Sequence, residues 1–501
     1  MNKLNLLLGM VTVLSMYSCN FLQEDPKTFM TPDMYYETAD QMQDAVNGMY
    51  PPVFAAYTDG LVAPNHNTFI MLETITGYHK RTYPFDSGIL GYNLPLTDAN
   101  ALLGNNWNEM YTAISRANNV LEGIANSDAD VDEGTRSKFL GEAYFIRAYC
   151  YFFLVQLYGP VPVPTKPTTG KADIVTELTG IAGVYQRIID DLTEAETLME
   201  GQPWHTGDGH VSKGAVKSLL AKVYLTMAGY PLQDASKYEM AYAKAKEVRD
   251  SGAYSLYANP TDISASANRN KKEAIFTSQY KRVSEWSSPV HCWFLPFYEG
   301  SSNEVFANNQ AHGGALVPSS TFINTYEAGD KRADEQQYFY NSYNGINFPQ
   351  PFVFKYFDEA ALAENISDVA LPLLRYSDIL LVMAEAKCAG GTTTDADAIQ
   401  AYYDVRNRYA SLPKPTSLSF NDVYLERIWE LCFEDQAWFD MLRTRKTMNA
   451  TGNVVDMIGY APFEHPGVTF TEDCLLFPYP VAEKRLNSHL SGLTVAQRLA
   501  L

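Results

Sequence analysis

The sequence is poor in cysteine, and it lacks the close cysteine pairs that metal and redox sites use. Its 501 residues contain 6 Cys, at positions 19, 150, 292, 388, 432 and 474. No two of them form a CxxC pair, so zinc and thiol chemistry have no local support. Three of them, Cys150, Cys388 and Cys432, lie in apolar, helix-like segments, where a free thiol packs as a small hydrophobe. A disulfide between Cys292 and Cys474 stays an open alternative.

Basic residues are also scarce. The chain has 38 Lys and Arg against 58 Asp and Glu, a net charge of −20, and no Lys/Arg-rich run interrupts this balance. An acidic field of this kind repels phosphate backbones, which argues against nucleic acid as a partner.

Motifs for metal, phosphate and nucleophile chemistry are missing or incomplete. The 8 His form no HExxH pattern, and no GxSxG occurs, so we expect no metal, no cofactor and no catalytic residue. Gly209 to Gly214 imitates a phosphate loop, but Ala215 stands where Lys is required, which favours a turn and a helix start. Asp128, Asp130 and Asp132 resemble the opening of an EF-hand loop. Phe139 at its twelfth position cannot chelate, so an acidic loop between helices is favoured.

Three carboxylates do share one helix face. Glu426, Glu430 and Glu434 recur at i,i+4 spacing, and two carboxyls about 5–9.5 Å apart could serve a glycosidase. Interleaved Arg427, Arg443 and Arg445 favour ion pairs with neighbouring helices instead.

Long apolar runs are absent except at the start of the chain. Lys3 and the apolar run from Leu4 to Met16 are typical of a signal peptide, here residues 1–18, because the run is too short to span a bilayer. Ser18-Cys19 follows it as in a bacterial lipobox, which implies that Cys19 is lipidated. The acidic stretch behind Cys19 resembles the surface-export signal of Bacteroidetes lipoproteins. A plain acidic linker is the alternative.

The sequence has strong helical periodicity, and the fold class that we predict is all-α. Helices of this kind in adjacent pairs predict a tetratricopeptide-like scaffold with large irregular loop insertions. Helical patterns are expected at 38–57, 105–126, 135–158, 180–200, 213–229, 236–251, 371–390, 395–410 and 421–446. Short strands are expected at 274–277 and 352–355. In this division, 19–36 is the lipidated Cys and linker, 37–251 an N-terminal helical region with a loop insertion at 58–103, 252–370 an irregular ligand-binding insertion, and 371–501 a C-terminal helical region.

Five stretches together resemble the SusD/RagB family of nutrient-uptake lipoproteins. They are Gly141 to Val163, which ends in a Leu-Tyr-Gly-Pro-Val-Pro turn, Leu374 to Ala386, Arg406 to Arg408, Glu426 to Arg443 and Leu476 to Pro480. The sequence departs from the family pattern at Asp435 and Ala437, where Gly and Arg are usual, at Tyr403, where Asn is common, and in its ending. The resemblance implies an outer-membrane lipoprotein that caps a SusC-like TonB-dependent barrel and captures oligosaccharides, or in some members peptides, for import.

Aromatic side chains in two loop regions are the candidate ligand-binding residues. Aromatic rings cover the flat C–H faces of sugars, while polar neighbours bond the hydroxyls, and the family tends to build its ligand site in these regions. The candidates are Tyr78, Arg81, Tyr83, Tyr92 and Asn93 in the first region, and Trp286, Trp293, Phe297, Tyr298 and Asn303 in the second. Packing of these rings onto the scaffold is the alternative, and Trp107 and Trp438 are expected in the core. The sequence thus predicts a glycan-binding protein on the cell surface, with peptide binding and a glycosidase as the alternatives.

Overall fold

The computed structural model of the protein describes residues 35–58, 68–80, 94–170, 175–283, 287–296, 316–364 and 366–501. The predicted signal peptide and Cys19 lie outside these ranges. Helices hold 50% of the residues and strands 9%, and within the described ranges each strand pairs with one other strand. The all-α prediction is therefore confirmed.

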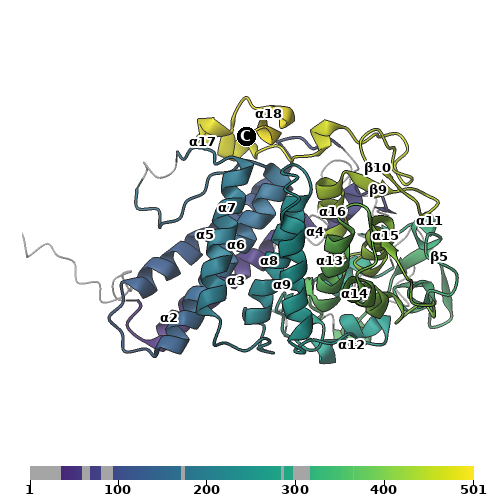
Figure 1. The fold of residues 1–501 in the computed structure, drawn as a ribbon, viewed down its shortest axis with the longest axis horizontal. Helices are drawn as coiled ribbons and strands as arrows, with labels where there is room; N and C mark the ends of the chain where they lie inside the picture. Colours follow the sequence, from purple (N-terminus) through teal and green to yellow (C-terminus); the bar gives the residue numbers. More distant parts are fainter. Residues whose placement is uncertain are drawn as a thin grey trace, which may run out of the picture.

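The N-terminal half is an array of long helices that pack as antiparallel neighbours (Figure 1). Helix α6 packs between α5 and α7, and α8 packs on α9. Side chains buried at helical spacing, such as Val184, Ile188 and Leu192 of α7, supply the contact face. The helices of this half are α2 (Ala39–Asn47), α3 (Tyr50–Thr58), α4 (Thr68–Ile75), α5 (Ala101–Ala125), α6 (Glu133–Tyr158), α7 (Ile181–Leu198), α8 (Lys213–Ala228) and α9 (Lys237–Asp250).

The C-terminal half continues the array through α13, which packs against α8 and α9 on one side and α14 and α15 on the other. It also carries most of the short strands, on the right of Figure 1. Its helices are α10 (Val290–Phe294), α11 (Ser320–Ile323), α12 (Glu359–Glu364), α13 (Tyr376–Cys388), α14 (Ala396–Arg406), α15 (Phe420–Glu430), α16 (Gln436–Thr444), α17 (Val481–Leu486) and α18 (Val495–Leu499).

In the described ranges the strands form five two-stranded antiparallel ladders. They pair β1 (His79–Lys80) with β3 (Val317–Pro318), β2 (Ala274–Thr277) with β6 (Pro372–Arg375), β4 (Phe339–Tyr343) with β5 (Ile346–Val353), β7 (Thr392–Thr393) with β8 (Leu418–Ser419), and β9 (Lys446–Met448) with β10 (Val454–Asp456). Of these ladders, β4–β5 and β9–β10 are local hairpins, and the other three join segments farther apart in the chain. The strand expected at 274–277 is confirmed, and the one at 352–355 is the end of the longer β5.

Local chemistry interrupts three of the expected helices. The helix at 38–57 is two helices, because Pro51 and Pro52 start a new helix and cannot continue the old one. The helix at 421–446 breaks after Glu430, since Phe433 and Asp435 have φ of 62° and 55°. The pattern at 371–390 begins as strand β6 and becomes helical only at Tyr376. Helix α4 lies inside the stretch expected to be irregular.

One large hydrophobic core runs through both halves, from Met42 of α2 to Leu490 near the C-terminus. Trp107 and Trp438 belong to it, at 3% and 0% exposure, as the sequence predicts. The five described cysteines are free thiols, so the alternative of a Cys292–Cys474 disulfide is wrong. Among the helices that the structure describes, none combines the length and apolar composition needed to cross a membrane.

Candidate ligand-binding site

A short ladder brings the two predicted loop regions together. Strand β1 pairs antiparallel with β3, with His79 opposite Pro318 and Lys80 opposite Val317. The first loop, 81–93, follows Lys80 directly in the chain, and 297–315 ends two residues before Val317. Residues more than two hundred positions apart therefore meet at this point, which we call the β1–β3 junction.

Most of the predicted ligand-binding residues lie in these two segments or beside them, outside the described residues. They are Arg81, Tyr83, Tyr92, Asn93, Trp286, Phe297, Tyr298 and Asn303. For these eight residues, the assignment stays a prediction.

Tyr78 is described, and it is part of the core. Its side chain is 2% exposed, and its ring is stacked with Phe322 and Phe463, each at 5.9 Å between centroids. Its hydroxyl lies 3.0 Å from the Thr447 hydroxyl and accepts a hydrogen bond from the Met448 amide. These contacts use both ring faces and the hydroxyl, so Tyr78 supports the junction and has no surface to offer a ligand.

Trp293 is also buried, at 0% exposure. Helix α10 turns the indole inwards, against the ring of Phe69 on α4 at 5.4 Å and beside Phe294. The prediction of direct ligand contact is corrected for Trp293 as for Tyr78. For both residues, packing onto the scaffold is the role that the structure supports.

A buried polar cluster lies beneath β1. Glu73 of α4 accepts a hydrogen bond from the Asp435 amide at 2.7 Å, and its other oxygen lies 3.5 Å from Nε2 of His79. Burial raises the pKa of Glu73 to about 7, an effect that the Asp435 amide and the charge of Lys355 only partly offset. Burial also raises the pKa of Asp435, with the nearby charge of Glu73 adding to it, and lowers the pKa of His79 to about 3. The base of the first loop thus rests on carboxyls that favour their neutral form.

A third segment, which sequence reasoning missed, completes the junction. Residues of the segment 447–470 contact Gly77 and Tyr78, directly before β1, and Pro462 sits on Gly77, where a Cβ atom would lie 2.2 Å from the proline Cβ. Phe463 and His465 are half-buried there. An aromatic, proline-rich run from Tyr460 to Pro466 in a stretch without helical periodicity was the signal that could have identified this segment.

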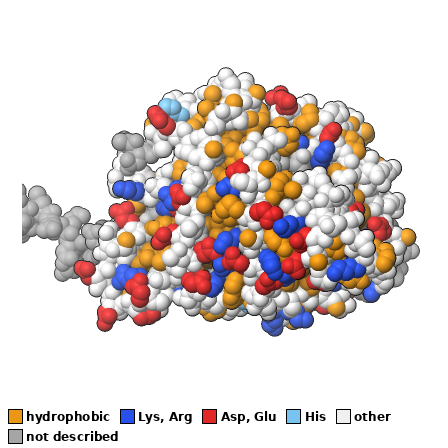
Figure 2. All heavy atoms as spheres, in the orientation of Figure 1, with side chains coloured by type: hydrophobic (Ala, Val, Ile, Leu, Met, Phe, Trp, Pro, Cys, Tyr) orange, Lys and Arg blue, Asp and Glu red, His pale blue; other side chains and the backbone are white. Residues whose placement is uncertain are grey.

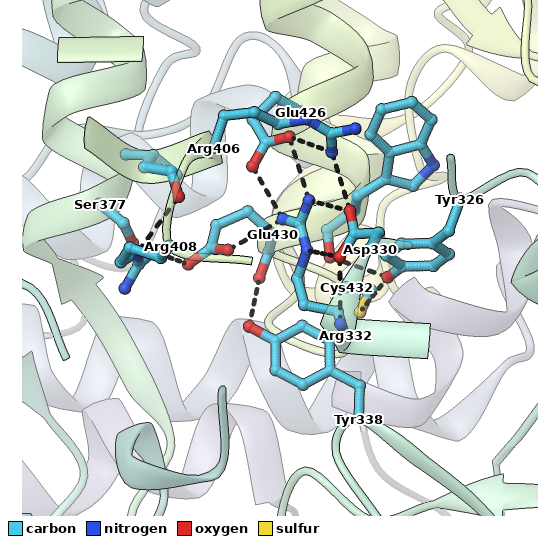
Figure 3. A network of polar contacts seen from close by, with 12 residues as sticks. Tyr326, Asp330, Arg332, Tyr338, Ser377, Arg406, Arg408, Glu426, Glu430 and Cys432 are labelled. Carbon is cyan, nitrogen blue, oxygen red and sulfur yellow. Dashed lines mark hydrogen bonds and ion pairs between the residues drawn. The ribbon is translucent and has the colours of Figure 1, made fainter. Parts of the chain in front are cut away.

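The three carboxylates of α15 and its following turn belong to an ionic network, as predicted, and Figure 3 shows the part of it around Glu426 and Glu430. Glu426 and Glu430 are 0% exposed and Glu434 is 4% exposed. The Arg332 guanidinium lies 2.8 Å from Glu426 and 3.0 Å from Glu430, and Glu434 pairs with Arg375 at 2.6 Å.

The network continues over several segments. Arg406 binds Glu426 at 2.9 Å, and Arg408 binds Glu430 at 2.6 Å. Burial alone would raise the pKa of Glu430, but the charges of Arg408, Arg375 and Arg332 outweigh it and lower that pKa. A carboxylate that is buried, ionised and saturated with guanidinium contacts cannot donate a proton to a sugar, so this face is not a catalytic pair.

Arg427 and Arg443 form the ion pairs with neighbouring helices that the sequence predicts. Arg427 pairs with Asp440 and Asp378, each at 2.8 Å. Arg443 binds Glu385 and Asp440, while Arg445 lies over the ring of Tyr230. Arg427 and Arg443 therefore hold α15 and α16 against α13. The charges of the three glutamates are balanced by arginines from other segments, namely Arg332, Arg375, Arg406 and Arg408.

Two motifs rejected as ligand sites are helix caps. Ser212 accepts a hydrogen bond from the Ala215 amide and caps α8, so Gly209 to Gly214 is a turn and helix start. Asp132 caps α6 through the amide of Thr135. Both segments satisfy backbone amides that a helix leaves unpaired.

Family comparisons match most of the chain. A family profile described as "SusD family" matches residues 211–492, and one described as "Starch-binding associating with outer membrane" matches residues 21–225. A "SusD-like protein" of Bacteroides ovatus is 24% identical over 466 residues, which cover 88% of this chain and 82% of that protein.

Solved structures share the fold. A SusD superfamily protein from Parabacteroides distasonis superimposes with a TM-score of 0.81 at 29% identity, over 90% of this chain and 98% of its own. Surface glycan-binding protein A from Bacteroides thetaiotaomicron, in complex with laminarihexaose, gives a TM-score of 0.72 at 18% identity, over 91% and 99% of the two chains. This second likeness concerns the fold alone.

Proposed function

Because the chain belongs to the SusD family, we propose that it captures oligosaccharides at the cell surface and delivers them to a SusC-like TonB-dependent barrel. SusD-like proteins are non-catalytic, and this chain is a binding protein, not an enzyme. The carboxylates of Glu426 and Glu430 on α15 are buried and ion-paired with arginines, which agrees with this conclusion.

The observation that carries the proposal is the β1–β3 junction. It pairs Lys80 with Val317, the strand residues nearest in the chain to the two loop segments, and the sequence of these segments is rich in aromatic and amide side chains, among them Tyr83, Tyr92 and Asn303. Sugar sites need this mixture, because rings cover apolar sugar faces and amides bond the hydroxyls. The rigid base of stacked Tyr78, Phe322 and Phe463 would hold the loops in register.

The predicted lipid on Cys19 would hold the protein at the outer membrane. Several acyl chains together give a stable anchor, since each buried CH₂ contributes about 0.8 kcal/mol. A surface anchor would keep the ligand site close to the barrel, and it supports the assignment of the barrel as the partner.

Native affinity electrophoresis tests the proposal. We would use the chain without residues 1–18 and with Cys19→Ser, in gels that contain different polysaccharides, with product analysis of the same mixtures. We expect retardation by at least one polysaccharide and no shortened sugars. The triple variant Tyr83→Ala, Trp286→Ala, Tyr298→Ala should lose the retardation, at least tenfold in affinity.

Tyr230→Ala is the matched control, because this tyrosine is 41% exposed at the turn between α8 and α9 and belongs to neither loop segment. It should leave the retardation unchanged. Shortened sugars would overturn the non-enzymatic role, and a triple variant with native affinity would overturn the site. If no polysaccharide retards the chain and immobilised peptides retain it, the ligand is a peptide and not a sugar.

A further inference from the structure

Two carboxyl groups, those of Glu73 and Asp435, are buried together beneath β1, and we call them the carboxyl pair. Glu73 on α4 is 1% exposed, and Asp435 in the turn after α15 is 3% exposed. One Glu73 oxygen accepts a hydrogen bond from the Asp435 amide at 2.7 Å. The other Glu73 oxygen and both carboxyl oxygens of Asp435 have no hydrogen-bond partner among the described residues. Burial of three such oxygens is very unfavourable when the groups are ionised, so the fold favours the uncharged acids.

The cation that faces the carboxyl pair is engaged elsewhere. The Lys355 ammonium donates to two backbone carbonyls at the end of α15 and in the turn that follows, at 3.2 and 2.9 Å, and to the Glu434 carboxylate. These bonds use all three of its donors. Glu434 is held in turn by Arg375 at 2.6 Å. No Lys or Arg of the described ranges forms an ion pair with either member of the carboxyl pair.

The other titratable groups around the pair are uncharged at neutral pH. His79 lies 3.5 Å from Glu73, and burial lowers its pKa to about 3. His465 lies against the His79 backbone, and burial lowers its pKa as well. Burial raises the pKa of the remaining groups, which are Tyr57 and Tyr149 beside Asp435 and Tyr356 and Cys432 beside Glu73. Bound protons are therefore what keeps the carboxyl pair uncharged.

The pair lies where it can determine the position of β1. Helix α4 lies beside α16 and leads into β1 (Figure 1). The Thr76 hydroxyl donates to the Glu73 carbonyl at 2.6 Å and accepts from the Tyr78 amide at 3.2 Å, directly before β1. From the other side, Phe433 in the turn after α15 stacks on the His79 ring at 4.2 Å. Strand β1 is thus held between the two segments that carry the carboxyl pair.

The backbone of the turn does not require an acid at position 435. Asp435 has a φ of 55°, in the left-handed region that glycine adopts without steric strain, and glycine is usual here in the family. The carboxyl group of Asp435 gains no hydrogen bond from the described residues in return. The geometry of the turn therefore does not explain this carboxyl.

We propose that Glu73 and Asp435 are positioning residues: as uncharged acids they hold β1 in place, and loss of a proton to solvent displaces β1 and weakens ligand binding at the β1–β3 junction. The effect on the ligand rests on the proposed oligosaccharide-binding function. The pKa of Glu73, raised to about 7, gives the sign, since this carboxyl is uncharged below that pH and ionised above it. Ligand affinity therefore falls as the pH rises.

Hydrogen exchange of β1, followed by mass spectrometry, tests the carboxyl pair without a ligand. The protein is the chain without residues 1–18 and with Cys19→Ser, and the rates are corrected for the intrinsic effect of pH. From about pH 6 to about pH 8, we expect protection in peptides that cover 76–80 to fall at least about fivefold. The double variant Glu73→Gln, Asp435→Asn has no titratable carboxyl at the pair and should keep its protection. Asparagine also tolerates the left-handed backbone.

Calorimetric titration with laminarihexaose, maltohexaose and xylohexaose tests the effect on binding. The uncharged fraction of Glu73 falls from about 0.9 at pH 6 to about 0.1 at pH 8, so the affinity for a hexasaccharide that binds should fall by up to about tenfold. The double variant should bind with equal affinity at both pH values. Glu73→Gln alone should remove most of the fall, whereas Asp435→Asn alone should keep most of it, because Glu73 still ionises.

Glu194→Gln combined with Asp130→Asn is the matched control. Both side chains are exposed, on α7 and in the loop between α5 and α6. Removal of the same two charges at these positions should leave both pH profiles as in the native chain. The triple loop variant should lose affinity at every pH and keep the native exchange profile of β1, because its substitutions leave the carboxyl pair intact.

The outcomes separate this proposal from the proposed function. Protection of β1 that changes with pH no more in the native chain than in the double variant would overturn the positioning role. A pH-dependent protection together with a constant affinity for a hexasaccharide that binds would overturn the link to the ligand. Absence of hexasaccharide binding at every pH would count against the oligosaccharide function, and the exchange of β1 would then decide the role of the carboxyl pair by itself.

Discussion

At the scale of single residues, the cluster of Glu73, His79 and Asp435 shows how burial changes chemistry. Asp435 occupies a left-handed backbone position, φ 55°, where the family usually has glycine. Both of its carboxylate oxygens are buried without a hydrogen-bond partner among the described residues. An ionised carboxylate there would be very costly, so the neutral acid is favoured.

This cluster makes stability depend on pH. The folded-state pKa of Glu73, about 7, lies above its ordinary value of 4.5, so its contribution is complete below about pH 4.5 and is lost as the pH rises through 7. The shift corresponds to about 3 kcal/mol. His79, with a pKa lowered to about 3, acts in the opposite sense, because its contribution is lost as the pH falls below 6.5.

The difference between Glu73→Gln and the native chain isolates the carboxyl. Urea unfolding should show the variant gaining up to about 3 kcal/mol relative to the native chain between pH 4.5 and 8. Glu194→Gln, on the exposed face of α7, should show no pH-dependent difference. A constant difference for Glu73→Gln over this range would contradict the prediction.

At the scale of elements, helix ends and breaks are set by local chemistry. Prolines at 51 and 52 separate α2 from α3, and left-handed residues at 433 and 435 separate α15 from α16. The break after α15 lets Glu434 pair with Arg375 and lets the Asp435 amide donate a hydrogen bond to Glu73. An unbroken helix at 421–446 could not make both contacts.

The cap of α8 gives the prediction at this scale. Ser212→Ala removes the hydrogen bond to the Ala215 amide, 3.2 Å long, and should lower the free energy of unfolding by about 1 kcal/mol. Ser212→Thr keeps a hydroxyl and should cost less. The measurement is urea unfolding with and without phosphate at about 10 mM, which is chosen to saturate weak sites. Stabilisation by phosphate in the native chain alone would show that the motif binds anions after all.

At the scale of the whole molecule, the two halves share one core and many polar contacts. Lys222 of α8 pairs with Asp378 of α13 at 2.6 Å, and the Phe477 amide donates to the Leu157 carbonyl at the end of α6 at 2.6 Å. On the face shown in Figure 2, acidic and basic side chains are interspersed and hydrophobic side chains gather above them. Charge therefore does not divide the molecule into two units.

We expect one cooperative thermal transition in scanning calorimetry, with equal calorimetric and van't Hoff enthalpies. Lys222→Met leaves Asp378 with one cationic partner fewer, and it should shift the whole transition to a lower temperature without splitting it. Lys246→Met, which removes a more exposed pair with Asp250, is the control and should shift it little. Two resolved transitions would contradict this coupling.

The sequence by itself determined the helical scaffold, because apolar residues at helical spacing can be recognised within a short window of neighbouring residues. It also determined the family, through motifs such as Glu426 to Arg443, and the ionic role of the three glutamates. It predicted the two loop regions of the candidate site, and these depend only on local composition.

Only the tertiary structure decided which aromatic side chains are buried, because burial depends on neighbours distant in sequence. Tyr78 is enclosed by Phe322, Phe463 and Thr447, and Trp293 by Phe69, none of which is near in the chain. For the same reason, the partners of the glutamates and the β1–β3 junction could not be predicted. Each is a contact between segments whose separation along the chain leaves no periodic signal.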